Sequence, residues 1–187
     1  MTALPGFAAG GLTGMSVRVK RCAAFLPLVL VVCLAGWARA AAPTLDALRA
    51  AADSDELSLA ALAQKLGDER VLSALGDDQD ALLRLAAVRA TPYLIDKDAA
   101  LLPLARIAAG RDPELAPPAA FRARRIAQAL VLEGLAAREI MPATLAPARD
   151  ALLALAADTT ARRDLRLHAE QAAHLLGTLG VTSSAAP

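Results

Sequence analysis

From residue 44 onward the chain is a succession of short stretches rich in alanine and leucine, most of them followed by glycine or proline. Alanine is the best helix former and leucine is close to it, while the alternating pattern typical of β-strands is missing. Only 3% of the residues are aromatic, so the core has to be built mainly from alanine and leucine. These features predict an all-α fold.

Capping residues and helix breakers divide this region into eight predicted helices. Thr44 and Ser58 are the expected N-caps of the first two, and Gly180 is expected to end the last. We expect residues 181–187, VTSSAAP, to form a disordered tail. The predicted helices are 44–52, 59–66, 68–75, 80–90, 98–109, 121–139, 144–157 and 162–179.

Two sequence patterns recur along these helices. The stretch ALLPLARIA, which starts at Ala100, resembles ALLALAADT, which starts at Ala151. The stretches LRLAAVRA at Leu83, FRARRIAQA at Phe121 and LRLHAEQAA at Leu165 share an apolar residue, an arginine and then alanines. Their starts lie 38 and 44 residues apart, and a period of about 40 indicates repeated helical hairpins.

Residues 71–90, VLSALGDDQDALLRLAAVRA, resemble a HEAT repeat, with a turn at Gly76 and an arginine early in the second helix. Residues 152–177 are similar, with Asp158 in the turn and Arg166 at the matching position. The resemblance extends over roughly residues 44–180 and implies a right-handed α-solenoid of three to four HEAT-like hairpins. The corresponding domain spans residues 41–180.

The middle hairpin departs from this pattern by an insert, GRDPELAPPAA, at residues 110–120. Its prolines, Pro113, Pro117 and Pro118, favour extended geometry. The insert is either a neutral variation in length or a projecting contact loop with Phe121 as a buried anchor at its base.

One helical hairpin cannot bury its own apolar face, so neighbouring repeats have to share a core. Small residues allow helices to approach closely, and we expect this of Ala86, Ala87, Ala127, Ala169 and Ala172. Larger residues are expected to fill the spaces between layers, namely Leu82, Leu85, Ile126, Leu130, Leu165 and Leu176.

The segment before this domain has the order of parts of a secretory signal peptide. Arg18, Lys20 and Arg21 precede an apolar run, and Ala38-Arg39-Ala40 fits the signal peptidase rule. We expect translation to start at Met15 and cleavage to follow Ala40. The alternative is a retained anchor in the inner membrane, although the apolar run of 17 residues, 22–38, is at the lower limit of about 17–25 for a membrane span.

Cleavage removes both cysteines, Cys22 and Cys33, and four of the 20 basic residues. The remaining 147 residues carry 16 basic and 19 acidic side chains, a net charge of −3. Such a chain has no excess of positive charge for nucleic acid. We expect a periplasmic or secreted protein of the bacterial cell envelope that does not contact the membrane once the signal is removed.

Acids and arginines of the hairpins have two interpretations. In the structural one, Asp77 or Asp78 and Asp158 cap the helices that follow, while Arg84 and Arg166 pair with acids of adjacent repeats in a ladder. In the functional one, arginines on second helices line a concave groove for an acidic peptide or anionic polymer, as the HEAT resemblance implies. These candidate partner-binding residues are Arg84, Arg89, Arg122, Arg125 and Arg166.

No catalytic, cofactor or metal site is predicted. His168 and His174 lie six residues apart on one helix, about 120° apart around its axis, and do not converge on a metal. The region after residue 40 has no G-x-S-x-G, no H-E-x-x-H and no glycine-rich phosphate loop. We therefore expect a non-catalytic exported scaffold that binds a protein partner. The alternatives are an inner-membrane-anchored structural or assembly subunit and an enzyme that uses exposed carboxylates.

Overall fold

A computed structural model of the protein describes residues 43–110, 112–135 and 139–182. The predicted signal peptide, its start at Met15, its cleavage site after Ala40 and tail residues 183–187 lie outside this range. Within the described residues the fold is all-α, with eight α-helices, two short 3₁₀ helices and no strand. No helix among them is both long enough and apolar enough to cross a membrane.

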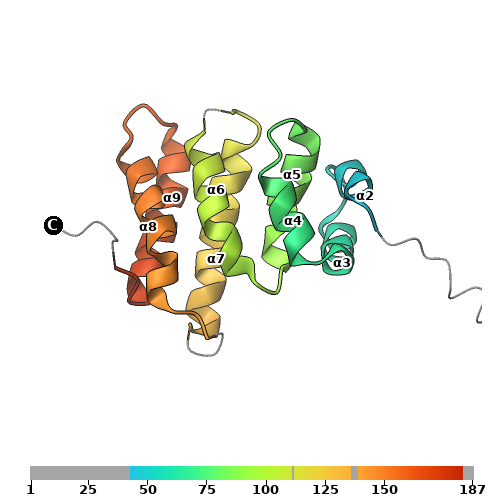
Figure 1. Ribbon diagram of the computed structural model, residues 1–187. Helices are drawn as coiled ribbons and strands as arrows, with labels where there is room; N and C mark the ends of the chain where they lie inside the picture. The colour runs from blue at the N-terminus through green and yellow to red at the C-terminus, as the bar shows by residue number, and fades with distance from the viewer. Residues whose placement is uncertain (1–42, 111, 136–138, 183–187) are drawn as a thin grey trace, which may run out of the picture. The chain divides into compact units, whose positions relative to one another are not determined.

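The helices follow one another with short connections (Figure 1). Two 3₁₀ helices, η1 (Thr91–Tyr93) and η2 (Lys97–Ala100), join the fourth α-helix to the fifth. The α-helices are α2 (Leu45–Ala50), α3 (Glu56–Leu66), α4 (Asp68–Leu75), α5 (Ala81–Ala90), α6 (Leu101–Ala109), α7 (Ala116–Glu133), α8 (Pro142–Ala157) and α9 (Arg163–Thr178).

Helices that are consecutive in the chain pack as pairs, and each pair contacts the next. The pairs are α2 with α3, α4 with α5, α6 with α7, and α8 with α9. Between pairs, α5 contacts α2, α3 and α7, while α6 packs on α8 and α7 packs on α9 (Figure 1). The apolar face of each pair is therefore covered by a neighbour that is close in sequence.

Alanine residues are buried throughout this core, as expected. The five alanines predicted there are all fully buried, as are Ile126, Leu130 and Leu176. Leu165 is also buried, and Leu85 is partly buried against the core. The prediction is wrong for Leu82, which is 49% exposed: its neighbour Leu83 takes the inward position, and adjacent helical residues point about 100° apart.

The first two helix starts differ in how well the sequence predicted them. Thr44 caps α2 as expected, because its hydroxyl accepts a hydrogen bond from the Ala47 amide at 3.4 Å. For α3 the cap is Asp55 and not Ser58. The Asp55 carboxylate accepts hydrogen bonds from the Leu57 and Ser58 amides, both at 3.0 Å, and from the Ser58 hydroxyl at 2.7 Å.

The turn acids do not cap the helices that follow them, which corrects the structural interpretation. Asp77 accepts hydrogen bonds from the Gln79 and Asp80 amides at 2.9 and 3.2 Å, and Asp80 is the residue that caps α5. Asp158 accepts from the Thr160 amide at 2.9 Å, whereas the N-cap of α9 is Arg162. Aspartate readily bonds the amide two residues on, so these acids stabilise their own turns.

Helix α7 includes part of the insert. It begins at Ala116, so that Pro117 and Pro118 lie in its first turn and not in an extended loop. Proline is tolerated there because the first amides of a helix have no intrahelical partner. The helix ends at Glu133, before the predicted residue 139, because Gly134 leaves the helix with φ 79°.

The C-terminal end of the core extends one residue beyond the predicted domain boundary. Val181 is buried, and its amide donates a hydrogen bond to the Leu176 carbonyl at 3.3 Å. This residue therefore packs on α9 and does not belong to a disordered tail.

Candidate protein-binding surface

Two of the five predicted binding arginines donate to backbone carbonyls, Arg84 at the end of α4 and Arg89 in the turn that follows α2. Arg84 donates to the Leu75 carbonyl at 2.9 Å and pairs with Asp78 at 2.5 Å. Arg89 donates to the carbonyls of Ala52 and Ser54, the latter at 2.8 Å. Arginine commonly satisfies the last carbonyls of a helix, as Arg84 does here. The predicted ladder is wrong for Arg84, because Asp78 belongs to the turn of its own hairpin.

Arg122 joins α7 to α3. Its guanidinium pairs with the Glu56 carboxylate at 2.6 Å, and the Tyr93 hydroxyl donates a hydrogen bond to the other oxygen of that carboxylate. The hydrogen bond from Arg122 and, after it, the one from Tyr93 hold the pKa of Glu56 below its ordinary value. Burial, together with the bond to Glu56, raises the pKa of Tyr93.

Arg166 lies on the flank of α9 that faces α8. Ala173 occupies the same stripe of the helix, seven residues further on, and Arg149 of α8 donates to the Ala173 carbonyl at 3.4 Å. Arg166 and His168 are two residues apart and therefore point to different flanks. The groove predicted for the five arginines stays a prediction.

The flank of α9 that faces α7 carries a different group of side chains around Phe121. The His168 ring meets the Phe121 ring edge-on, with centroids 5.7 Å apart. The guanidinium of Arg124 lies 5.1 Å from the centre of the Phe121 ring, and that of Arg122 lies 5.7 Å from it. Arg124 also donates to the Gln171 side chain at 3.1 Å.

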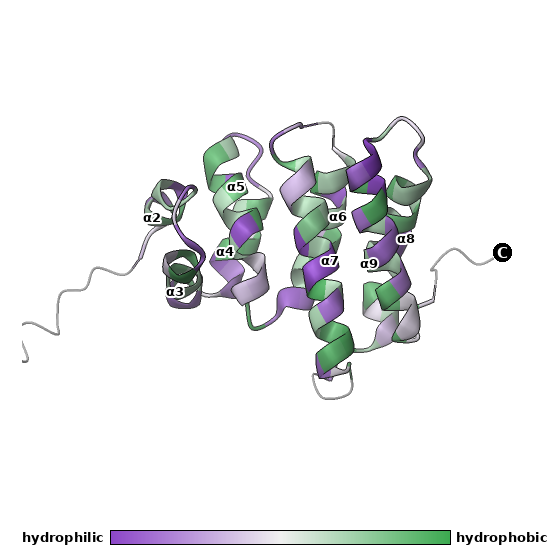
Figure 2. Ribbon diagram, turned by 180° about the vertical axis from the view of Figure 1, so that it is seen from behind, coloured by the Kyte–Doolittle hydropathy of each residue, from purple (hydrophilic) through white to green (hydrophobic). Residues whose placement is uncertain are grey.

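Arg125 completes this surface. It lies four residues after Phe121, on the same face of α7, and it is exposed. Within the described part of the chain it has no hydrogen bond or ion pair. The Phe121 cluster is defined by six residues, Phe121, Arg122, Arg124, Arg125, His168 and Gln171. Hydrophilic segments of α7 and α9 are visible on this side of the molecule (Figure 2).

The Phe121 cluster is positively charged and partly desolvated. Burial and, after it, the nearby Arg124 lower the pKa of His168, which favours its neutral ring. The Nε atom of Arg124 and the Nδ1 atom of His168 are buried without a hydrogen-bond partner among the described residues. Cation–π contacts hold the two guanidiniums beside the ring. The cluster can therefore offer an aromatic surface and guanidinium groups to a carboxylate-bearing segment.

Sequence reasoning missed Arg124, His168 and Gln171 as members of this surface. The available signal was the spacing from Phe121 to Arg124, which places them on neighbouring positions of one helix face. His168 does not converge with His174, which is exposed. Among the described residues no group of three histidine, cysteine or acidic side chains is placed to hold a metal ion.

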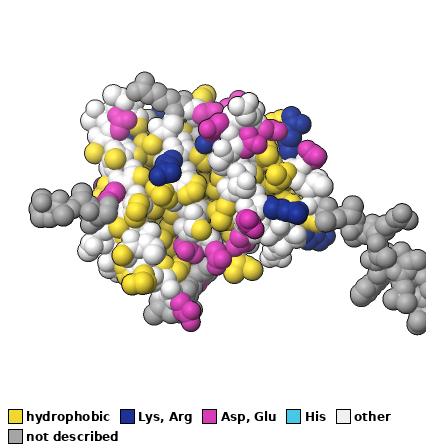
Figure 3. Space-filling model, viewed as in Figure 1, with side chains coloured by type: hydrophobic (Ala, Val, Ile, Leu, Met, Phe, Trp, Pro, Cys, Tyr) yellow, Lys and Arg dark blue, Asp and Glu magenta, His cyan; other side chains and the backbone are white. Residues whose placement is uncertain are grey.

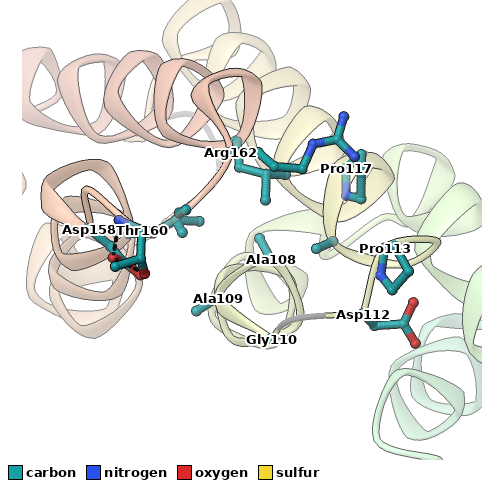
Figure 4. Close-up of a pocket in the computed structure, with 13 residues that line it drawn as sticks. Ala108, Ala109, Gly110, Asp112, Pro113, Pro117, Asp158, Thr160 and Arg162 are labelled. Atoms are coloured by element: carbon teal, nitrogen blue, oxygen red, sulfur yellow. Dashed lines mark hydrogen bonds between the residues drawn. The ribbon is translucent and has the colours of Figure 1, made fainter.

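A pocket of about 440 Å³ lies at the turns of the last two helix pairs. Pro113 and Pro117 line one side of it, Asp158 and Thr160 lie on the opposite side, and the Arg162 side chain extends toward Pro117 (Figure 4). The Arg162 guanidinium pairs with Asp164 at 2.8 Å. The insert therefore contributes to a pocket wall, and Phe121 at its end is partly exposed and not a buried anchor.

Comparison of the chain with protein-family models, with curated proteins and with solved structures finds no match. The HEAT resemblance stays a prediction from the residues, and the function has to be argued from the surfaces of the molecule.

Proposed function

We propose that this chain is a non-catalytic scaffold of HEAT-like helical hairpins, arranged as a right-handed α-solenoid, that binds a protein partner in the bacterial cell envelope. The packing of helix pairs in sequence order and the recurring arginine and alanine pattern support this arrangement. In such repeat proteins each unit contacts its neighbours, and the outer faces of the helices remain available for binding.

The Phe121 cluster is the proposed binding surface. The observation that carries the proposal is an exposed arginine, Arg125, one helical turn after an aromatic ring that two further guanidiniums flank. Aromatic and arginine side chains dominate the binding energy of many protein interfaces, and arginine forms strong charge-assisted hydrogen bonds with carboxylates. The partner is therefore a protein with an exposed acidic segment.

Export is the second part of the proposal, and retention at the inner membrane is its alternative. The two differ in whether the N-terminal segment is cleaved, and the intact mass of the protein isolated from cells shows this. A chain that starts at Ala41 supports a released envelope protein. A chain that retains residues 22–38 supports an anchored subunit.

The binding proposal is tested by exchanging charge at Arg125. We expect Arg125→Glu to abolish chemical cross-linking of the protein to its envelope partner, because an acidic segment is then repelled. Arg106→Glu is the matched control: Arg106 is an exposed arginine on α6, also without a hydrogen bond or ion pair in the described residues. Equal cross-linking by both variants contradicts the proposal, provided circular dichroism shows that both are folded.

A further inference from the structure

The end of the molecule where α7 finishes and α8 begins exposes three large apolar side chains. Ile95 follows η1 and is 78% exposed, Leu132 of α7 is 81% exposed, and Met141, just before α8, is 69% exposed. Scattered apolar residues are normal on a protein surface, but neighbouring ones mark interaction sites. In Figure 1 this is the lower end of the helix pairs.

An ion pair and a hollow lie at this end of the molecule. Lys97 of η2 pairs with Glu133, the residue after Leu132. A hollow of about 480 Å³ between η2, α6 and α8 is lined by Met141, Leu102 and Leu145, with Asp98 and Glu139 also in its wall. We call this hollow, with Met141 at its edge, the lower groove. Its volume lies in the range of about 300–1,000 Å³ that is typical of binding pockets.

Acidic residues dominate the surroundings of the lower groove. Residues 95–98 and 132–141, which form this end of the molecule, contain four acids, Asp96, Asp98, Glu133 and Glu139, and Asp68 at the start of α4 accepts a hydrogen bond from the Asp96 amide. Residues 95–98 and 132–141 contain two basic residues, Lys97 and Arg138, of which Arg138 lies outside the described residues. Acidic side chains gather along this edge beside apolar ones (Figure 3).

We propose that the lower groove docks a basic amphipathic segment of a partner protein. An apolar side chain of that segment enters the groove against Leu102 and Met141, while flanking lysines or arginines face Asp98 and Glu139. The occupant is argued from charge: the surrounding acids repel anionic lipid headgroups and acidic peptides and favour a cationic partner. The groove has a charge opposite to that of the Phe121 cluster, so the inference is independent of the binding proposed for that cluster.

Two labelled peptides of equal length test the proposal, one with alternating pairs of leucine and lysine and one with glutamate in place of lysine. We expect the unaltered protein to raise the fluorescence anisotropy of the basic peptide and not of the acidic one. Met141→Ser and, separately, Asp98→Asn/Glu139→Gln should each weaken binding by about fivefold or more, as expected for loss of an interface anchor. Leu57→Ser is the matched control, because Leu57 is 83% exposed on α3, outside the groove.

Several outcomes overturn the proposal. One is that the basic peptide binds equally to the unaltered protein and to the groove variants, which indicates attraction to net charge only. Another is that Leu57→Ser weakens binding as much as Met141→Ser. A dimer that Met141→Ser dissociates in analytical ultracentrifugation shows that a second copy covers the groove, and groove-dependent binding to vesicles of anionic phospholipid shows a membrane contact instead.

Discussion

The contact between Arg122 and Glu56 ties α7 to a helix 66 residues earlier in the chain. The two side chains differ in exposure: that of Arg122 is 11% exposed and that of Glu56 is 53% exposed. This difference predicts an asymmetric response to mutation. When Arg122 is replaced by methionine, the Glu56 carboxylate can return to water, whereas Glu56→Ala leaves the guanidinium largely desolvated and without its acid.

The expected magnitudes follow from that geometry. A hydrogen bond to a charged group contributes about 1.5–3 kcal/mol, whereas an exposed ion pair contributes about 0–1 kcal/mol. Because Glu56 is half exposed and keeps its bond from Tyr93, we expect Arg122→Met to lower the free energy of unfolding by about 1–2 kcal/mol. Glu56→Ala should lower the free energy of unfolding by about 2–3 kcal/mol, because it leaves the largely buried Arg122 guanidinium without an acidic partner. The double variant should reveal a coupling of about 1 kcal/mol.

The effect should also depend on pH in a defined direction. The pKa of Glu56 in the folded protein lies below its ordinary value of 4.5. A carboxylate with a lowered pKa stabilises the fold fully above its unfolded pKa, and this stabilisation is lost as the pH falls through the folded pKa. The difference in unfolding free energy between the unaltered protein and Arg122→Met should therefore be largest at neutral pH and narrow below pH 4.5.

Urea unfolding followed by far-ultraviolet circular dichroism measures all three variants against the unaltered chain. The reasoning is refuted if Glu56→Ala is less destabilising than Arg122→Met. That result would mean that leaving the more buried Arg122 unpaired costs less stability than leaving the exposed Glu56 unpaired. A difference that stays constant down to pH 3 would show that Glu56 does not contribute through its charge.

Three further predictions concern the fold. Leu130→Ala should lower the free energy of unfolding by about 2–5 kcal/mol because Leu130 is fully buried, whereas Leu82→Ala should change it by less than about 0.5 kcal/mol in the same urea assay. Gly134→Ala should destabilise the protein by about 1–2 kcal/mol because φ is 79° at this position; no change in urea midpoint would show that the turn adapts. Asp55→Ala should lower the melting temperature more than Ser58→Ala, since Asp55 caps α3, and calorimetry that ranks them in reverse would contradict this assignment.

Local sequence features predicted most of the helices, because alanine and leucine favour helix wherever glycine or an extended turn does not intervene. Gly67, Gly76 and Gly110 each follow a helix as expected. Boundaries were less predictable where one residue type serves two purposes. Pro117 is compatible with an extended insert and with the first turn of a helix, and only the packing of α7 decides between them.

The candidate surface was less accessible to sequence reasoning than the helices. An arginine on a second helix can bind a partner or reach a nearby carbonyl, and its position in the repeat does not distinguish these outcomes. Arg89 reaches Ala52 and Ser54, which lie 37 and 35 residues earlier, so its role depends on tertiary contacts. Arg124 was missed because it does not occupy the position that the repeats share.

The central claim is that helix pairs stack in the order of the chain and share one core. Nuclear Overhauser effects between leucine and alanine methyl groups in residues 41–187 test it most directly. The account predicts cross-peaks between α6 and α8 and between α7 and α9, the helix contacts that join the last two pairs. Absence of these cross-peaks, together with extensive ones between α8 or α9 and α2 or α3, would contradict it.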